Sequence, residues 1–217
     1  MDLLRTERVP EWETINPDEW NKWQQRAAET NGWDTPGNRE TLKGLVASLA
    51  GVWFLHKDNL PAALGLLTYG RIQDLRDGAK AAATGTKSPL GEAFDATSDK
   101  IVMAAALPVL ARQKILNKPE VIGLVAQHGI ASLATITAKV RHQEIHPSRY
   151  GKISTFSQWV ALGLIGVGKV LPQKYELIGD KLETAGRISL TLGTALGAIA
   201  TAGYIKDAMS PPLTSNL

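Results

Sequence analysis

The sequence predicts an all-α fold, an integral membrane bundle of six transmembrane helices. Six stretches lack Lys, Arg, Asp and Glu, and two of them reach 18 residues, close to the ~20 that span a bilayer. If the N-terminus is cytoplasmic, the stretches on that side hold 16 of the 24 Lys and Arg residues. The four shorter stretches also fit a buried helical core, so a soluble helical protein is the alternative. The six stretches are 44–55, 60–70, 101–110, 121–138, 155–168 and 188–205.

Composition excludes several classes of site. The chain has no cysteine, which removes disulfides, thiolate metal sites and cysteine nucleophiles. The net charge of +3 comes from scattered basic residues, so nothing beyond this mild charge supports a nucleic-acid partner, and we expect none. The N-terminal residues lack the apolar run of a signal peptide.

The first 35 residues form a polar arm that carries four of the six tryptophans. Asn16 followed by Pro17 predicts a helix start, which would place Trp20, Trp23 and Ala27 on one face. Such a helix fits the surface of a bilayer, and it fits packing against the protein body equally well. We therefore predict two domains, an amphipathic arm over 1–35 and a membrane domain over 36–217.

Four aspartates flank a stretch of small residues between two of the apolar segments. Asp74 and Asp77 are three residues apart, and Asp95 and Asp99 are four apart, so each pair shares one face of a helix. Ser88 followed by Pro89 predicts the start of the second helix, with 80–87 as the connecting loop. Two acidic faces brought together would offer oxygen ligands to a divalent cation, whereas separate faces would simply be solvated.

Taken whole, this stretch resembles the signature of the CDP-alcohol phosphatidyltransferases. That signature reads D-x-x-D-G-x-x-A-R, then about eight residues, then G-x-x-x-D-x-x-x-D. One position departs from it, because Ala82 stands where the family has arginine. The matching residues are Asp74, Asp77, Gly78, Ala81, Gly91, Asp95 and Asp99.

The resemblance extends over about residues 36–206. Asn38 and Thr41 stand where the family opens its first membrane helix. The segment 151–158 is similar to the G-K-x-K-T-x-x-Q segment of phosphatidylglycerophosphate synthases and related cardiolipin synthases. A Gly193–Gly197 pair in the last apolar stretch allows close helix packing, which we expect inside one chain.

The resemblance implies a homodimeric membrane protein with a polar cavity that faces the cytoplasm, or the matrix in an organelle. Asp74, Asp77 and Asp95 would hold two Mg²⁺ ions, with Mn²⁺ as a possible substitute. Asp99 would complete the second metal site and act as general base on the acceptor hydroxyl.

The resemblance also implies a set of substrate contacts. The missing arginine at position 82 normally meets the donor phosphates, and Lys80 or Lys87 could supply its charge. Basic residues on the same predicted side either bind an anionic acceptor or are ordinary cytoplasmic loop charge. The expected substrate-binding residues are Asn38, Thr41, Gly78, Ala81, Ser88, Gly91, Arg141, Arg149 and Lys152.

The function that follows is Mg²⁺-dependent transfer of a phosphatidyl group from CDP-diacylglycerol to an alcohol, with release of CMP. Glycerol-3-phosphate is the expected acceptor because of the 151–158 segment. Phosphatidylglycerol and inositol phosphate are the other acceptors to consider. A non-catalytic membrane scaffold is the competing class, with Ala82 as its first indication.

Overall fold

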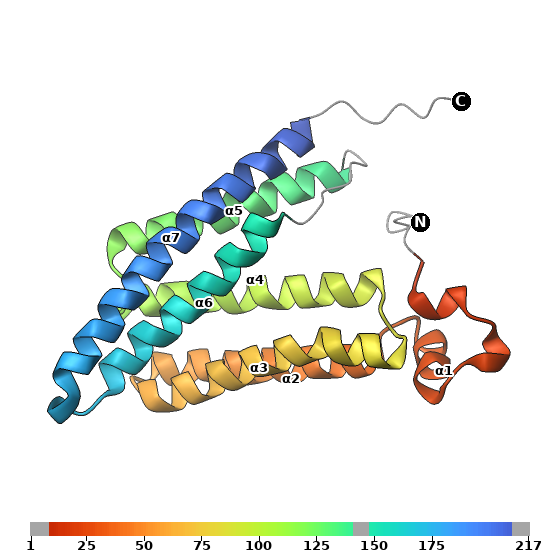
Figure 1. The fold of residues 1–217 in the computed structure, drawn as a ribbon, viewed down its shortest axis with the longest axis horizontal. Helices are drawn as coiled ribbons and strands as arrows, with labels where there is room; N and C mark the ends of the chain where they lie inside the picture. The colour runs from red at the N-terminus through yellow and green to blue at the C-terminus, as the bar shows by residue number, and fades with distance from the viewer. Residues whose placement is uncertain (1–8, 141–147, 210–217) are drawn as a thin grey trace. The chain divides into compact units, whose positions relative to one another are not determined.

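The computed structural model describes residues 9–140 and 148–209, and these residues form helices and no strand. The chain folds as two compact units that divide after Val109, and Figure 1 labels their helices. The first unit contains the 3₁₀ helices η1 (Glu11–Thr14) and η2 (Pro17–Glu19) and the helices α1 (Lys22–Glu29), α2 (Pro36–His56), α3 (Leu60–Thr84) and most of α4 (Pro89–Arg112). The second contains α5 (Lys118–Val140), α6 (Arg149–Val170), η3 (Gln173–Tyr175) and α7 (Glu176–Met209).

Each of the six apolar stretches lies within one helix, α2 to α7 in chain order, so the all-α prediction is confirmed. Within the described residues, three helical segments are long and apolar enough to cross a membrane, and all three belong to the second unit. Their apolar side chains are extensively exposed: Ile122 on α5 is 66% exposed and Leu192 on α7 is 60% exposed. These surfaces indicate a membrane protein. Spanning by α2, α3 and α4, and with it the count of six, stays a prediction.

Two of the expected helix boundaries are wrong. The helix predicted to begin at Pro17 is instead the short η2, and α1 begins at Lys22, where the Asn21 side chain accepts hydrogen bonds from two backbone amides and completes a capping box. The predicted loop 80–87 is mostly helix, because its alanines favour helix and α3 continues to Thr84. Gly85 then ends α3 in the left-handed conformation, with φ of 64°.

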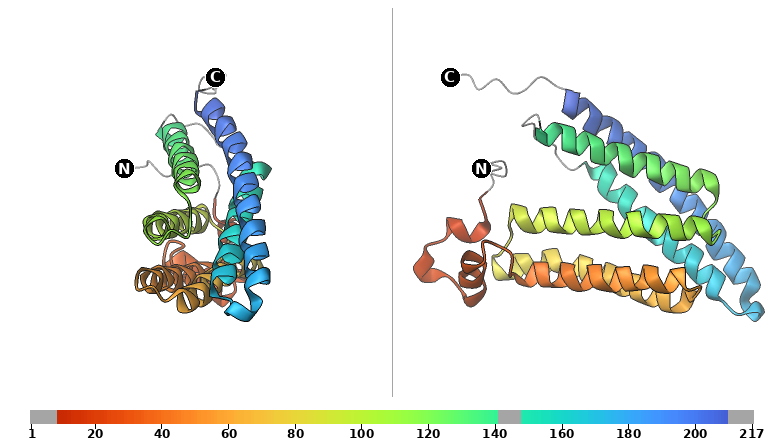
Figure 2. Two further views of the ribbon diagram at one scale, coloured as in Figure 1. Left: turned by 90° about the vertical axis from the view of Figure 1, so that its left-hand side faces the viewer. Right: turned by 180° about the vertical axis from the view of Figure 1, so that it is seen from behind.

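Glycines at intervals of seven residues bring α2 and α3 together as an antiparallel pair, which Figures 1 and 2 show side by side. A β-carbon at Gly44 would lie 3.0 Å from the carbonyl oxygen of Gly70, and one at Gly51 would lie 3.2 Å from that of Ala63. One interval earlier, a β-carbon at Gly37 would lie 3.2 Å from the carbonyl oxygen of Asp77. The two backbones therefore approach each other through positions that have no side chain.

Glycines at intervals of seven residues also allow α6 and α7 to pack closely. Here Gly179, Gly186 and Gly193 recur at intervals of seven, and their missing β-carbons would lie 2.8 to 3.2 Å from carbonyl oxygens of α6. Gly197 packs against Gln127 of α5 and Ser154 of α6. The Gly193–Gly197 pair thus serves packing within one chain, as expected.

A buried polar cluster holds α5 against α6 next to these glycines. The amide nitrogen of Gln158 donates to Gln127 at 2.7 Å, and its oxygen lies 3.0 Å from a ring nitrogen of His128. Gln158 and Ser154 are fully buried. Because apolar surroundings offer no other partner, these bonds contribute to the choice of helix pairing. Gln158, the last residue of the 151–158 segment, therefore has a structural role.

Replacing Gly186 by alanine should test the close packing of α6 and α7. The new methyl group would lie 2.7 Å from Ile165 Cγ1 and 2.9 Å from the carbonyl oxygen of Ala161. We expect the free energy of unfolding in detergent to fall by about 1–3 kcal/mol. Gly163→Ala on α6 is the matched control, because its methyl group would meet nothing within 4 Å and should leave stability equal or slightly higher. Equal thermal unfolding of the two variants would contradict the packing argument.

Candidate functional site

The turn between α3 and α4 brings the four aspartates to one end of the first unit. Gly85 ends α3, and only four residues later Pro89 starts α4, so the two helices run antiparallel. The Ser88 hydroxyl oxygen accepts a hydrogen bond from the Gly91 amide at 3.0 Å and caps the start of α4. The end of α3, with Asp74 and Asp77, therefore faces the start of α4, with Asp95 and Asp99.

Three of the four carboxylates converge. Asp74, Asp77 and Asp95 each offer an oxygen, and these oxygens lie within 4.8 Å of one another. Asp95 Oδ1 is buried and has no hydrogen-bond partner among the described residues. A buried carboxylate oxygen without a partner is costly, and a hard cation with oxygen ligands would satisfy it. The donor set therefore fits a divalent cation.

The electrostatics of the cluster point the same way. The aspartates lie outside the apolar stretches of their helices. Burial, together with the hydrogen bond and charge of nearby Asp74, raises the pKa of Asp95 to about 8. Burial also raises the pKa of Asp77, although the Thr41 hydroxyl opposes that rise. The carboxylates repel one another, and a bound cation would reduce that repulsion.

Thr41 acts on a carboxylate of the cluster. Its hydroxyl donates to Asp77 Oδ2 at 2.7 Å, and both side chains are buried. The Asn38 amide instead donates to the carbonyl oxygens of Gly32 and Trp33, at 2.9 and 3.1 Å. Thr41 therefore orients a metal-ligand candidate, and Asn38 ties the N-terminal residues to α2.

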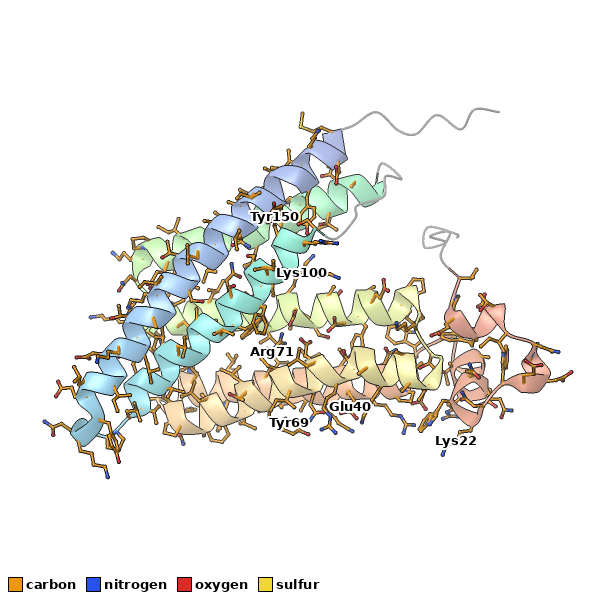
Figure 3. The ribbon with its side chains drawn as sticks, in the orientation of Figure 1. Lys22, Glu40, Tyr69, Arg71, Lys100 and Tyr150 are labelled. Carbon is orange, nitrogen blue, oxygen red and sulfur yellow. The ribbon has the colours of Figure 1, made fainter. Side chains whose placement is uncertain are left out.

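Asp99 lies outside the group of three and pairs with Arg71, which our sequence analysis missed. One guanidinium nitrogen, Nη1, lies 2.6 Å from Asp99 and 3.1 Å from Asp74. Figure 3 shows Arg71 between α3 and α4. Arg71 precedes Asp74 by three residues on one helix face, and that spacing is a signal the sequence carried. Arg71 therefore holds Asp99 beside the cluster.

A cavity of about 140 Å³ opens beside the cluster. It brings together most of the predicted substrate contacts, and it adds Lys87 and Thr86 from the turn. A β-carbon at Gly78 would meet nothing within 4 Å, so packing does not require glycine there, and its absence of a side chain widens the cavity. The lining residues that the sequence predicted are Asn38, Thr41, Asp77, Gly78, Ala81, Ser88, Gly91 and Asp95.

The structure distinguishes the two lysines that could replace the missing arginine. Lys80 forms an ion pair with Glu40 of α2, whose side chain is 5% exposed, and Figure 3 labels Glu40. Lys87 instead lines the cavity. Ala82 itself is exposed and is not part of the lining.

The remaining predicted contacts belong to the second unit. Arg149 and Lys152 lie exposed in the first turn of α6. Arg141 lies outside the described residues. Their role in binding an acceptor stays a prediction.

Comparison with known proteins identifies the family. The profile of the family described as CDP-alcohol phosphatidyltransferase matches residues 38–199 of the 217. The search of curated proteins and the search of solved structures each give no match. The matched region contains all four aspartates and all but one of the cavity-lining residues, Gly37. The chain therefore belongs to the CDP-alcohol phosphatidyltransferase family, whose members transfer a substituted phosphate group from a CDP-alcohol to an acceptor.

Proposed function

We propose that the protein transfers a phosphatidyl group from CDP-diacylglycerol to glycerol-3-phosphate in a Mg²⁺-dependent reaction. The observation that carries this proposal is the convergence of Asp74, Asp77 and Asp95 beside a cavity lined by residues of the same signature. The exposed apolar helices of the second unit support a lipid donor, because such a substrate resides in a bilayer. The 151–158 segment supports glycerol-3-phosphate as the first acceptor to test, with phosphatidylglycerol and inositol phosphate as the alternatives.

The residues have distinct roles in this proposal. Asp74, Asp77 and Asp95 would hold two Mg²⁺ ions, or Mn²⁺ in their place, and the metal would neutralise negative charge on the phosphate oxygens. Asp99 accepts the proton of the acceptor hydroxyl, whose oxygen attacks the lipid-side phosphorus. The bond from that phosphorus to the CMP oxygen breaks, and CMP leaves. Arg71 orients the Asp99 carboxylate, and Gly78 leaves space for the nucleotide.

The proposal also covers the side of the membrane that the site faces, the oligomeric state and the contacts to the acceptor. The catalytic residues face the cytoplasm, or the matrix in an organelle, and the protein works as a homodimer in the bilayer. The exposed Arg149 and Lys152, with Arg141, bind the phosphate of the acceptor.

A panel assay with labelled CDP-diacylglycerol tests the reaction: formation of phosphatidylglycerophosphate supports the proposal. Absence of any product with every acceptor would favour the non-catalytic scaffold.

A metal titration should separate Asp99 from the other three aspartates. Asn variants of Asp74, Asp77 and Asp95 lose a ligand, so higher Mg²⁺ or added Mn²⁺ should restore part of the turnover. Asp99→Asn loses the proton acceptor, which typically costs 10²- to 10⁴-fold in rate. Extra metal cannot replace a base, so this variant should bind the donor and stay inactive. Equal metal rescue of all four variants would remove the special role of Asp99.

Gly78→Ala should weaken donor binding without destabilising the fold. A methyl group there would meet no protein atom within 4 Å and would occupy space in the cavity. We expect an unchanged or slightly raised melting temperature, because alanine favours helix by about 0.5–1 kcal/mol, together with a higher KM for the donor. Gly65→Ala is the control, since Gly65 lies on the same helix, is equally open and is remote from the cavity lining. A normal donor KM in Gly78→Ala would show that the nucleotide does not approach this position.

A further inference from the structure

The N-terminal arm, defined here as residues 9–34, contacts the turn between α3 and α4. Figure 1 shows η1 and α1 at the end of the first unit where α3 leads into α4. The backbone amide of Glu11 donates to the carbonyl oxygen of Lys87 at 2.9 Å, and the Lys87 amide donates to the Glu11 carboxylate at 3.4 Å. The Asn21 side-chain amide donates to the carbonyl oxygen of Thr84 at 3.1 Å. The arm therefore contacts both ends of this turn.

Gln24 of α1 contacts the middle of the turn. Its side chain is buried at 5% exposure and donates to the Gly85 carbonyl oxygen at 3.4 Å. A β-carbon at Gly85 would lie 2.5 Å from Gln24 Nε2, and Gly85 also has a positive φ. The positive φ favours glycine, and the Gln24 side chain occupies the space beside the Gly85 α-carbon, so a larger residue would require the end of that side chain to shift.

The arm is itself well fixed. Trp12 is 3% exposed, and the indole of Trp20 donates to the carbonyl oxygens of Trp12 and Ile15 at 2.9 and 3.1 Å. Asn21 and Gln24 form a capping box at the start of α1. At its far end the arm is bound to α2 through Asn38. These bonds favour packing against the protein body over the alternative of a helix lying free on the membrane surface.

Lys87 belongs both to the turn that the arm contacts and to the lining of the cavity. Lys87 lines the cavity together with Asp77 and Asp95, whereas the ammonium group of Lys80 is paired with Glu40. The side chain at position 82 is a methyl group, where the resemblance implies an arginine that meets the donor phosphates. Among the described residues that line the cavity, Lys87 is thus the cationic one, and the arm holds its backbone from both its amide and its carbonyl side.

We propose that the arm is a positioning element for Lys87, which contacts the phosphates of the CDP-linked donor in place of the missing arginine. This inference rests on the proposed function, because it assigns the donor's diphosphate as the ligand. Glu11, Asn21 and Gln24 act through the turn and do not touch the donor. Lysine offers a point charge without the fork of arginine, so its contribution depends on where the backbone places it.

The test measures the Kd of the full-length protein for CDP-diacylglycerol in detergent micelles at saturating Mg²⁺, together with turnover at saturating donor. Lys87→Ala should raise the Kd roughly 10- to 100-fold, and Lys87→Arg should restore most of the affinity. Glu11→Pro removes both contacts to Lys87, and proline suits the first position of η1. It should raise the Kd roughly three- to tenfold while turnover at saturating donor stays near that of the wild type.

A double variant separates positioning from general stability. If the arm acts through Lys87, Glu11→Pro should add nothing to the Kd of Lys87→Ala. Gln24→Ala gives a second arm variant in case Glu11→Pro does not fold. Glu13→Ala and Gln25→Ala are the matched controls on η1 and α1, and both should bind the donor as the wild type does.

The outcomes distinguish the two proposals. A wild-type protein that neither binds nor turns over CDP-diacylglycerol overturns the proposed function. A wild type that binds the donor, with wild-type affinity in Lys87→Ala or in both arm variants, overturns the role of the arm alone. Multiplying effects in the double variant would overturn it too, because they would show that the arm and Lys87 act independently.

Discussion

The close antiparallel approach of α2 and α3 is the constraint on which the candidate site depends. Glycines at 37, 44 and 51 remove the side chains that would separate the two backbones. This register places Thr41 against Asp77 and Glu40 against Lys80. A shift of one residue would rotate these side chains away from one another. The packing of the hairpin therefore sets the orientation of a metal-ligand candidate as well as the stability of the fold.

The site brings several aspartate carboxylates together in partly buried surroundings. Burial and the neighbouring Asp74 together raise the pKa of Asp95 to about 8, and Asp95 Oδ1 lacks a hydrogen-bond partner among the described side chains. The Thr41 hydroxyl offsets part of the cost of burying Asp77. Arg71 does the same for Asp74 and Asp99 by pairing with both carboxylates. The remaining cost is typical of a site whose stability is completed by a ligand. A cation held at this site would therefore link metal binding to the folding of the helix ends.

The turn from α3 to α4 combines three demands. It must reverse the chain within four residues, present Ser88 and Lys87 to the cavity, and fit the N-terminal arm. Gly85 allows the chain to reverse because it has a positive φ, and it leaves room for the arm because it has no side chain. Because one turn serves both the cavity and the arm, a displacement of the arm would also move the cavity lining.

The sequence by itself determined the helical class, the six apolar stretches, the start of α4 and the four carboxylates, because periodicity, capping residues and motif spacing are local properties. It could not show that Asp99 pairs with Arg71, that Glu40 engages Lys80, or that Lys87 lines the cavity. It also placed the arm helix too early and the turn too long. Only the tertiary structure decided these points, since each depends on which helix faces lie together. Contacts between residues distant in the chain follow from helix packing, and a local pattern does not encode that packing.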